Sequence, residues 1–469
     1  MHRLMVAILV VALLGAVTWA PVAQAAPEIK VVVDGRPVSF DVPPALVQGR
    51  TLVPVRFVAQ ELGAQVDWEA ATRTVTVHKG TDEIAVQVGQ NTARVNGVAY
   101  QLDVSARMVR GRVLVPVRFF SELLGAAVAW DVATNTVFII TGRSVTPADM
   151  WITGYLYGAN SLRSVQENLD MLTGIFPFAY IAQADGSIGV DPVMQNPTVG
   201  WQEAENLARQ KGIPMYASIS QHSRDILQQL LFTGEARDRF VAEAFKLVVD
   251  QGYQGLNLDF EQVPASVAAR EAYDGLVQEL AARLHGAGLE LSLAVPAKVS
   301  DDVAWQLGYD YAGLGRYADY VVIMAYDEHH AGGEPGPVAS LPWVQQVAQY
   351  AASQIPPEKI LLGVGVYGYD WGASGNAKAV DLLTAQTLAM NSGAQVTWDA
   401  TAYVPHFTYW DAAGVKHEVW YEDPRSLAGK LEVGRANKLS GIAIWRLGMV
   451  APEMWQVIRG SLAPLGRTN

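Results

Sequence analysis

Apolar, strand-like runs alternate with helix-like segments along the last two thirds of the chain. The expected strands span residues 152–157, 176–181, 215–219, 256–260, 289–295, 320–326, 360–366 and 442–445. Eight such runs separated by helical patterns across roughly 320 residues are typical of a (β/α)8 TIM barrel of the α/β class. In that fold, functional groups gather where strands end, so the residues that end each run are the candidates for chemistry.

The first third of the chain contains an internal repeat. GRTLVPVRFVAQELGAQVDWEAATRTVTV begins at Gly49, and GRVLVPVRFFSELLGAAVAWDVATNTVFI begins at Gly111. Each copy predicts a VPVRF segment, a short helix that ends at a glycine, and two strands joined by a turn. One unit is too small to bury much apolar surface alone. We therefore expect a small duplicated α+β domain over residues 29–141, followed by a linker at 142–149.

The segment 1–25 has the features of a secretory signal. His2 and Arg3 precede an uncharged run over positions 4–17, and Ala23-Gln24-Ala25 supplies the small residues of a cleavage site. An uncleaved membrane anchor is the alternative, although the apolar run is short for a bilayer. Either segment implies export, so we expect a secreted or cell-wall-associated protein.

Composition excludes several kinds of site. The chain has no cysteine, which rules out disulfides, zinc–thiolate sites and a cysteine nucleophile. Its formal net charge of −12 argues against nucleic acid as a partner and suits an uncharged or mixed substrate.

The stretch GLNLDFE, at positions 255–261, alternates apolar and polar side chains. In a strand of period two, Asn257, Asp259 and Glu261 point to one face while the apolar residues point to the other. The neighbouring runs have the pattern of buried parallel strands, where an unpaired charge is costly. An amide and two acids on one face of such a strand therefore indicate chemistry, whereas a solvated or ion-paired edge would be the structural alternative.

Other strand ends add aromatic and polar side chains. The first strand contributes Tyr155, the sixth Met324, Tyr326 and Asp327, and the eighth Trp445. Acids bracketed by rings fit a carbohydrate cleft, because apolar sugar faces stack on rings and hydroxyl and amide groups require placed hydrogen-bonding partners.

From Trp151 to the C terminus the chain resembles glycoside hydrolase family 18, most closely its bacterial spore-germination and cell-wall branch. The motif D-x-x-D-x-D-x-E of that family aligns with positions 254–261, and MAYDEHHAGGEPGPVA, PPEKILLGVGVYGYDW and IAIWRLG resemble the branch at later strand ends. Gln254 and Asn257 replace two aspartates of the longer motif. Their neutral side chains remove like-charge repulsion near Asp259, while Asp259 and Glu261 are retained.

The family resemblance implies substrate-assisted, retaining hydrolysis. The Cα atoms of Asp259 and Glu261 are about 7 Å apart on one face, which suits acid and nucleophile flanking a bond poorly. In the family, the 2-acetamido oxygen of the sugar is the nucleophile. Glu261 would then protonate the leaving oxygen, Asp259 would accept the acetamido N–H, and Tyr326 would donate to the acetamido oxygen. Trp445 would form the floor, and Asn257, Tyr155, Met324 and Asp327 would line the cleft.

The repeat resembles the copper amine oxidase N-terminal-like domain. Between positions 27 and 150 the sequence contains one histidine, His78, which cannot make a copper site by itself. We expect either a wall-associated or substrate-presenting module or a folding spacer. In the barrel, adjacent His329 and His330 of a strand would diverge, so no metal and no cofactor is expected.

A tract at about 376–437, between the seventh and eighth strands, predicts a small α+β insertion with a turn at Asp411-Ala412-Ala413-Gly414. Within it, Tyr421 and Glu422 either reach substrate or pack inside the insertion.

The sequence predicts an exported retaining glycosidase that cleaves beside N-acetylglucosamine in peptidoglycan of the cell wall or spore cortex. A chitinase and a catalytically silent glycan-binding wall protein are the alternatives. Retention of Glu261 favours an enzyme over the silent protein.

Overall fold

The computed structural model describes residues 29–33, 36–80, 82–124, 126–131, 135–140, 148–196, 199–372 and 377–464. The expected signal segment, 1–25, lies outside these ranges, as does most of the expected linker. Ala148 and Asp149 already belong to the first barrel strand. Across the described ranges, every helix is too short or too polar to cross a bilayer.

The barrel predicted from the sequence is confirmed. Its strands are β14 (Ala148–Leu156), β15 (Gly174–Pro177), β18 (Tyr216–Gln221), β19 (Gly255–Phe260), β20 (Glu290–Pro296), β21 (Tyr320–Met324), β22 (Ile360–Gly365) and β28 (Gly441–Trp445). Neighbouring strands pair in parallel from β18 to β28, β28 pairs with β14, and β14 pairs with β15. A parallel bridge between Ile175 and Met215 closes the circle between β15 and β18.

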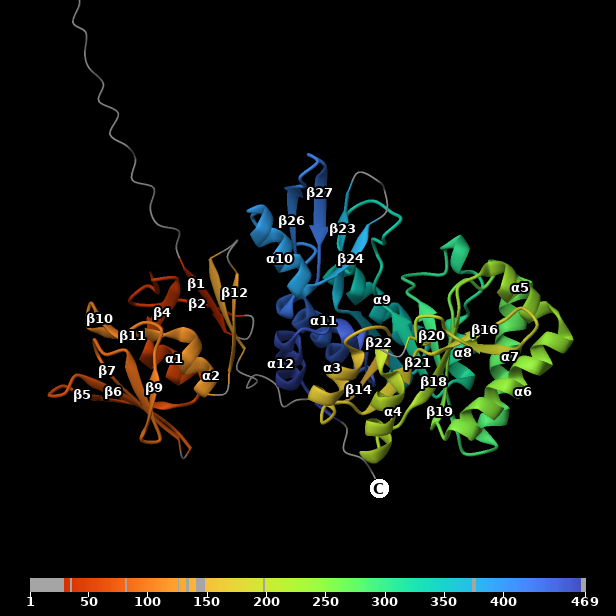
Figure 1. Cartoon of the computed structure of the whole chain (residues 1–469), viewed down its shortest axis with the longest axis horizontal. Helices are drawn as coiled ribbons and strands as arrows, with labels where there is room; N and C mark the ends of the chain where they lie inside the picture. Colours follow the sequence, from red (N-terminus) through yellow and green to blue (C-terminus); the bar gives the residue numbers. More distant parts are fainter. Residues whose placement is uncertain are drawn as a thin grey trace, which may run out of the picture.

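Helices cover the outside of the barrel (Figure 1). They are α3 (Ser161–Asn168), α4 (Trp201–Gln210), α5 (Arg224–Phe232), α6 (Gly234–Gln251), α7 (Val267–His285), α8 (Tyr311–Tyr317), α9 (Leu341–Gln354), α11 (Pro424–Ala436) and α12 (Pro452–Ser461). Short 3-10 turns occur at Ala304–Gln306, Pro357–Lys359 and Leu447–Met449, and β29 (Leu462–Pro464) pairs with the start of β14.

Caps define the two helices that flank β19. Helix α6 ends at Gly252, whose φ of 64° is the left-handed geometry that glycine adopts without a Cβ clash. Helix α7 begins after Ser266, whose hydroxyl accepts the Ala269 N–H at 3.1 Å. These caps stop the helices at the points where the chain enters and leaves the GLNLDFE segment.

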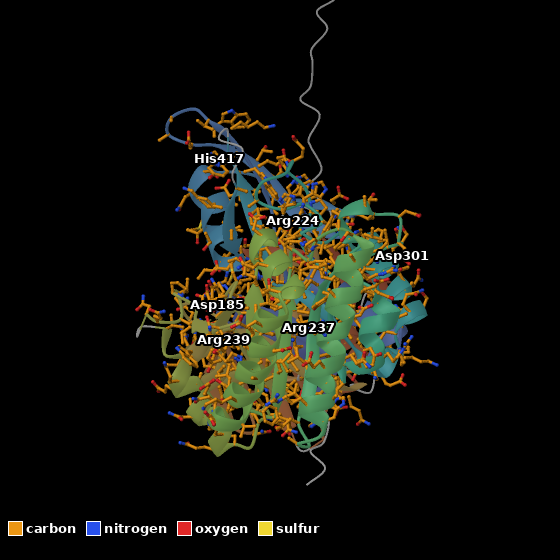
Figure 2. The ribbon with its side chains drawn as sticks, turned by 90° about the vertical axis from the view of Figure 1, so that its right-hand side faces the viewer. Asp185, Arg224, Arg237, Arg239, Asp301 and His417 are labelled. Carbon is orange, nitrogen blue, oxygen red and sulfur yellow. The ribbon has the colours of Figure 1, made fainter. Side chains whose placement is uncertain are left out.

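The expected second strand, 176–181, is divided in the structure. β15 ends at Pro177, which has no N–H to continue a ladder, and β16 (Tyr180–Ala182) starts after it. β15 pairs with β14, while β16 pairs with β18 and turns back into β17 (Ile188–Val190). Arg239 of α6 holds the turn of this hairpin by donating to Asp185 at 2.7 Å (Figure 2).

The alternation predicted for β19 is also observed. Leu256, Leu258 and Phe260 belong to the large core between strands and helices. A separate cluster, which includes Tyr155, Phe176 and Tyr216, fills the space inside the barrel. Asn257 and Asp259 share the inward face by the period-two geometry of the strand.

The repeats form one body, seen in red to orange in Figure 1. The first copy has β4 (Arg50–Pro54), α1 (Val55–Glu61), β5 (Gln65–Glu69) and β6 (Thr74–Lys79), and the second has β11 (Arg112–Pro116), α2 (Val117–Leu123), β12 (Ala127–Asp131) and β13 (Thr136–Ile140). β4 and β11 pair antiparallel, with Val53 opposite Val115. Val53, Val58, Val115 and Phe120 lie in one core, so the two copies pack together as expected.

Further strands show that the duplicated unit starts before Gly49. They are β1 (Lys30–Val33), β2 (Arg36–Val38), β3 (Ala45–Val47), β7 (Asp82–Gln87), β8 (Thr92–Val95), β9 (Val98–Gln101) and β10 (Arg107–Val109). β3 pairs with β4 as β10 pairs with β11. A small second core joins Val42 and Leu52 to their equivalents in the second copy, Val104 and Leu114.

The insertion after β22 forms a separate antiparallel sheet, which we call the lobe (positions 367–420). Its elements are β23 (Tyr367–Trp371), β24 (Lys378–Asp381), α10 (Leu382–Ser392), β25 (Thr397–Asp399), β26 (Val404–Trp410) and β27 (Lys416–Trp420). The strand order is β24-β23-β27-β26-β25, and the hairpin from β26 to β27 turns at positions 411–414 as predicted. Asp370 of β23 contacts His417 of β27 at 2.7 Å, which joins two neighbouring strands of the lobe.

Glycines allow the barrel strands to approach closely. A Cβ on Gly255, the first residue of β19, would lie 2.2 Å from the carbonyl oxygen of Glu290 in β20. Backbone cannot move aside as a flexible side chain can. The start of β19 therefore requires glycine for steric reasons.

We expect Gly255→Ala to destabilise the barrel by about 1–3 kcal/mol, because the added methyl overpacks against backbone. Gly234→Ala in α6 is the matched control, since a Cβ there meets nothing within 4 Å. Alanine in that helix should be neutral or stabilising by at most about 1 kcal/mol. Thermal unfolding followed by calorimetry measures both, and equal melting temperatures would contradict the close approach.

Candidate active site

The residues expected at the site lie toward the carboxyl ends of barrel strands, with Asn257 one layer deeper, in the middle of β19. Tyr155 is near the end of β14, Asn257 and Asp259 are in β19, and Glu261 follows β19 directly. Met324 ends β21, Tyr326 and Asp327 follow it, and Trp445 ends β28. In a closed parallel barrel these ends meet on one face. The fold therefore brings the whole predicted set to the same end of the barrel.

Asn257 is fully buried and forms a short chain of hydrogen bonds across three strands. Its Oδ1 accepts from Ser218 of β18 at 3.0 Å, and its Nδ2 donates to Ser292 of β20 at 3.0 Å. A carboxylate at this position would carry charge without solvent and would lack the donor that Ser292 accepts. The amide therefore satisfies the strand neighbours that an aspartate would leave unsatisfied.

Asp259 lies one pleat further along and is 3% exposed. Burial raises the pKa of its carboxyl well above the ordinary value, and the charge of Glu261 raises it further, while His222 opposes the shift. Within the described part of the chain, Oδ1 of Asp259 is buried without a hydrogen-bond partner. A buried acceptor of this kind calls for an explanation, and a donor supplied by a ligand would provide one.

Glu261 is held at its backbone and at its carboxylate. Its N–H donates to the Gln221 carbonyl at 3.1 Å, and its Oε2 lies 2.9 Å from Nδ1 of His222, just after β18. The next turn is fixed by Tyr309, whose hydroxyl donates to the Phe260 carbonyl at 2.7 Å and accepts the Val263 N–H at 3.1 Å. The side chain of Glu261 is 36% exposed. It therefore remains accessible from solvent although its backbone is rigidly placed.

Aromatic rings surround this end of the barrel. The rings of Tyr155 and Trp445 are 5.4 Å apart between centroids, and Phe178 packs edge-on against Trp445 at 5.2 Å. Tyr157 stacks on Trp445 at 6.0 Å. The peptide bond between Trp445 and Arg446 is cis. Trp445 remains partly exposed, so a face of apolar ring is available beside the acids.

The charges of the acids also act on two tyrosines, the buried Tyr155 and the half-buried Tyr326. Burial raises the pKa of Tyr326 well above its ordinary value, with added contributions from Tyr155, Asp259 and Glu261. Burial and the charges of Asp259 and Glu261 raise the pKa of Tyr155 in the same way. Both hydroxyls therefore keep their protons at neutral pH. Among the described residues, the buried hydroxyl of Tyr155 makes no well-formed hydrogen bond, although the nearby Asn257 side chain partly offsets the rise in its pKa.

Asp327 and Met324 complete the set predicted from the sequence. Asp327 has a φ of 60° and accepts from the hydroxyls of Tyr367 at 2.5 Å and Tyr369 at 3.1 Å. Because these tyrosines begin the lobe, Asp327 links β21 to the lobe. Met324 is partly buried against the cluster inside the barrel.

Other residues considered from the sequence lie elsewhere. Glu422 is 1% exposed and ion-paired with Lys430 of α11, and Tyr421 is 5% exposed. Packing is therefore the role of both, rather than contact with a substrate. His329 binds the Glu334 carbonyl and His330 accepts the Gly332 N–H. Nowhere in the described ranges do three metal-ligating side chains gather.

The sequence interpretation missed His222, Tyr309, Tyr367 and Tyr369 as parts of the site. His222 is the first residue after β18 and belongs to no motif, so only the strand-end rule signals it. Tyr309 approaches from the loop before α8, and sequence spacing contains no indication of that contact. Tyr367 and Tyr369 directly follow the seventh expected strand (360–366), so the sequence contained a signal for them as aromatic residues at a strand end, but they were not among the candidate site residues.

Comparison with protein families places two known regions along the chain. Residues 152–449 match the model of the glycosyl hydrolases family 18, and residues 32–139 match that of the copper amine oxidase N-terminal domain. The family-18 match covers every candidate residue named above.

Individual relatives agree with this assignment. The "Putative sporulation-specific glycosylase YdhD" of Bacillus subtilis (strain 168) is 40% identical over 238 residues, which are 50% of this chain and 56% of the relative. The cortical fragment-lytic enzyme of Bacillus anthracis is 32% identical over 298 residues, 61% of this chain and 67% of the relative. The chain thus spans little more than half of the first of these proteins.

A solved structure shares the architecture. The crystal structure of a chitinase from Chromobacterium violaceum superposes with a TM-score of 0.62 at 30% identity, covering 67% of this chain and 99% of the other.

The contact between His222 and Glu261 predicts a raised pKa of the His222 imidazole that depends on the Glu261 carboxylate. The hydrogen bond with Glu261 raises the pKa of His222 above 6.5, against a smaller lowering by burial. We expect the imidazole signal of His222 in NMR to titrate above 6.5 in the wild type and at lower pH in Glu261→Gln. Glu235→Gln, on the exposed first turn of α6, is the control and should leave the titration unchanged. Identical titrations in all three proteins would show that the pair does not form.

Proposed function

Because the chain belongs to glycosyl hydrolase family 18, we propose that it cleaves N-acetylglucosaminyl bonds of peptidoglycan, in the cell wall or spore cortex, with retention of configuration. One observation supports assigning this chemistry to Asp259 and Glu261 at the end of β19. Asp259 is buried beside Glu261, and its Oδ1 has no hydrogen-bond partner among the described residues. A substrate amide N–H satisfies that oxygen, and an N-acetylated sugar carries such a group next to its anomeric carbon.

Peptidoglycan is favoured over chitin by the character of the relatives. Two of them are named for sporulation or for lysis of cortical fragments, and one structural relative is named a chitinase. The N-terminal segment with signal-like features supports export to the wall. Chitin remains the second candidate because its glycan has the same N-acetylglucosaminyl unit.

In the first step, the carbonyl oxygen of the 2-acetamido group attacks the anomeric carbon while the bond to the leaving oxygen breaks. Glu261 donates its proton to that oxygen. Asp259 accepts the acetamido N–H and stabilises the positive charge that develops on the oxazolinium ring. Tyr326 donates its hydroxyl to the acetamido oxygen, and Trp445 supports the apolar face of the distorted sugar.

In the second step, Glu261 is a carboxylate and removes a proton from water, which attacks the anomeric carbon from the side of the departed group. The oxazolinium ring opens, and the product keeps its original configuration. Asp259 and Glu261 need one proton between them at the start. Burial and the charge of Glu261 raise the pKa of Asp259, so the pair retains a proton. The first step requires that this proton be on Glu261, with Asp259 ionised to accept the acetamido N–H.

His222 is a positioning residue in this mechanism, because it contacts Glu261 rather than the sugar. At a pH where the imidazole is neutral, its Nδ1–H donates to Glu261 and fixes the carboxylate rotamer. Asn257 acts one layer below, where its two serine contacts hold β19 in register with β18 and β20.

We expect Glu261→Gln to lower turnover on purified peptidoglycan by about 10²–10⁴-fold, because the amide cannot donate the proton. Binding should be retained, since the shape and dipole of the side chain are kept. Release of reducing sugar measures the rate, and mass spectrometry of the fragments should find N-acetylglucosamine at the reducing end. Glu235→Gln is the control that should behave as wild type.

Equal sugar release by the wild type and Glu261→Gln would reject the enzyme and favour the silent glycan-binding alternative. Rapid cleavage of chitin oligomers without fragments from peptidoglycan would favour the chitinase.

A second test concerns the nucleophile. Chemical removal of N-acetyl groups from the glycan should abolish cleavage, because the attacking oxygen is lost with them. Tyr326→Phe should lower kcat by about 10²–10³-fold on the acetylated glycan, since one preorganised donor is removed. Tyr100→Phe, on an exposed tyrosine of the repeat domain, is its control. Undiminished cleavage of the deacetylated glycan would contradict substrate assistance.

A further inference from the structure

The duplicated domain (positions 30–140) contains a cavity of about 660 Å³ between elements of the two copies. Its wall is formed by the β3–β4 hairpin of the first copy and by the start of α2 and strand β13 of the second. This volume lies in the range of pockets that bind small molecules. The cavity is remote in sequence from the β19 face and is not used by the proposed mechanism.

Two reciprocal ion pairs define where the cavity lies. Arg50 contacts Asp103 at 2.6 Å, and their counterparts in the repeat, Arg112 and Asp41, contact each other at 2.7 Å. The duplication therefore creates two equivalent positions related by the exchange of copies. Arg50 and Asp103 line the cavity and mark one of these positions.

The two positions are not filled alike. At the second position, the ring of Phe40 packs edge-on against Phe57, with centroids 4.6 Å apart. At the cavity, the residue equivalent to Phe40 is Leu102, which is 2% exposed in the core, and the equivalent of Phe57 is Phe119, which lines the cavity. Exchange of an aromatic ring for a buried leucine thus leaves space at one position.

The polar lining is also specific to the open position. Thr51 and Asn135 line the cavity, whereas their equivalents in the other copy are Val113 and Arg73. Gln101 lines it as well, where the other copy has Ser39. Hydroxyl and amide groups that face a cavity in one copy alone are suited to hydrogen bonds with a bound molecule.

The charge of the lining is positive. Arg50 is neutralised by Asp103, but Arg118 is exposed and makes no ion pair with any residue that the structure describes. The guanidinium fork binds a carboxylate through two parallel hydrogen bonds. Leu46, 59% exposed, and Phe119 add apolar surface at the same cavity. A free cation, amide and hydroxyl groups and an apolar wall together fit a short peptide that carries a carboxylate.

We propose that this cavity binds the carboxylate-bearing stem peptide of peptidoglycan. The proposal rests on the proposed function for the choice of polymer. The duplicated domain then holds the peptide of the wall polymer, and the barrel acts on the glycan.

Binding of the full chain to purified sacculi tests the proposal. Glu261→Gln is used as the parent so that the polymer stays intact, and hydrofluoric acid treatment removes phosphate polymers that would also attract Arg118. In this background, Arg118→Ala should raise the apparent Kd for co-sedimentation about tenfold or more, from the loss of a charge-assisted contact. Arg56→Ala is the matched control, because it removes the equivalent exposed arginine of the first copy, outside the cavity, and should bind as the parent.

Thr51→Val provides a second variant, since valine already occupies the equivalent position 113 in the other copy. It should also weaken binding, and unchanged thermal melting shows that the domain is folded. The parent should bind amidase-treated sacculi, which lack stem peptides, no more tightly than Arg118→Ala binds sacculi that keep their peptides. Parental affinity in both cavity variants, or affinity that survives peptide removal, would overturn the proposal. Loss of binding only when phosphate polymers are stripped would overturn it as well.

The hydrolase assay separates this proposal from the proposed function. With Glu261 intact, Arg118→Ala should cleave soluble peptidoglycan glycan strands freed of stem peptides at the wild-type rate and be slowed on intact sacculi. If the wild type hydrolyses none of these glycans, the proposed function is rejected. The co-sedimentation results still test whether the cavity binds the stem peptide.

Discussion

Closure of the parallel sheet is the constraint on which the remaining features depend. Once β28 returns to β14, every strand must end on the same rim, and the interior beneath the rim is filled by rings such as Tyr155 and Tyr216. Water is thereby excluded from the root of the site. Asp259 is buried for that reason, and its raised pKa is a consequence of the closed sheet together with the neighbouring charge of Glu261.

The layers below and above Asp259 have different tasks. Beneath it, the side chains of Ser218, Asn257 and Ser292 are neutral and hydrogen-bonded from strand to strand. β19 therefore buries one acid, Asp259, whereas an aspartate at position 257 would add a second. Above it, Glu261 sits on a turn that Tyr309 fixes from another loop, while its carboxylate remains open to solvent. Rigid backbone and an accessible carboxyl are the combination that acid–base work requires.

Much of this could be predicted from the sequence, because period and position carry most of the information. The alternating pattern indicated the barrel, and the period-two face of β19 grouped Asn257, Asp259 and Glu261. The segment that begins at Gly49 and recurs at Gly111 predicted the packed duplication.

Contacts between loops could not be predicted, since His222 and Tyr309 reach the β19 turn from segments whose local patterns carry no signal of it. Pro177 divided the expected second strand for a local reason that a run of apolar residues conceals. The start of the repeat before Gly49 was harder to recognise because equivalent positions there differ, as Phe40 and Leu102 do. Only isolated pairs such as Asp41 and Asp103 are identical.

The lobe leaves the barrel after β22 and the chain returns at β28, and these two strands are hydrogen-bonded neighbours. The ends of the excursion are therefore anchored side by side, and its length is independent of the barrel register. Insertions or deletions between positions 367 and 420 cost little in closure entropy and leave every strand pair of the barrel intact. Over evolutionary time this is the segment in which descendants of the protein can change the surroundings of the site while the strand ends that form it keep their geometry.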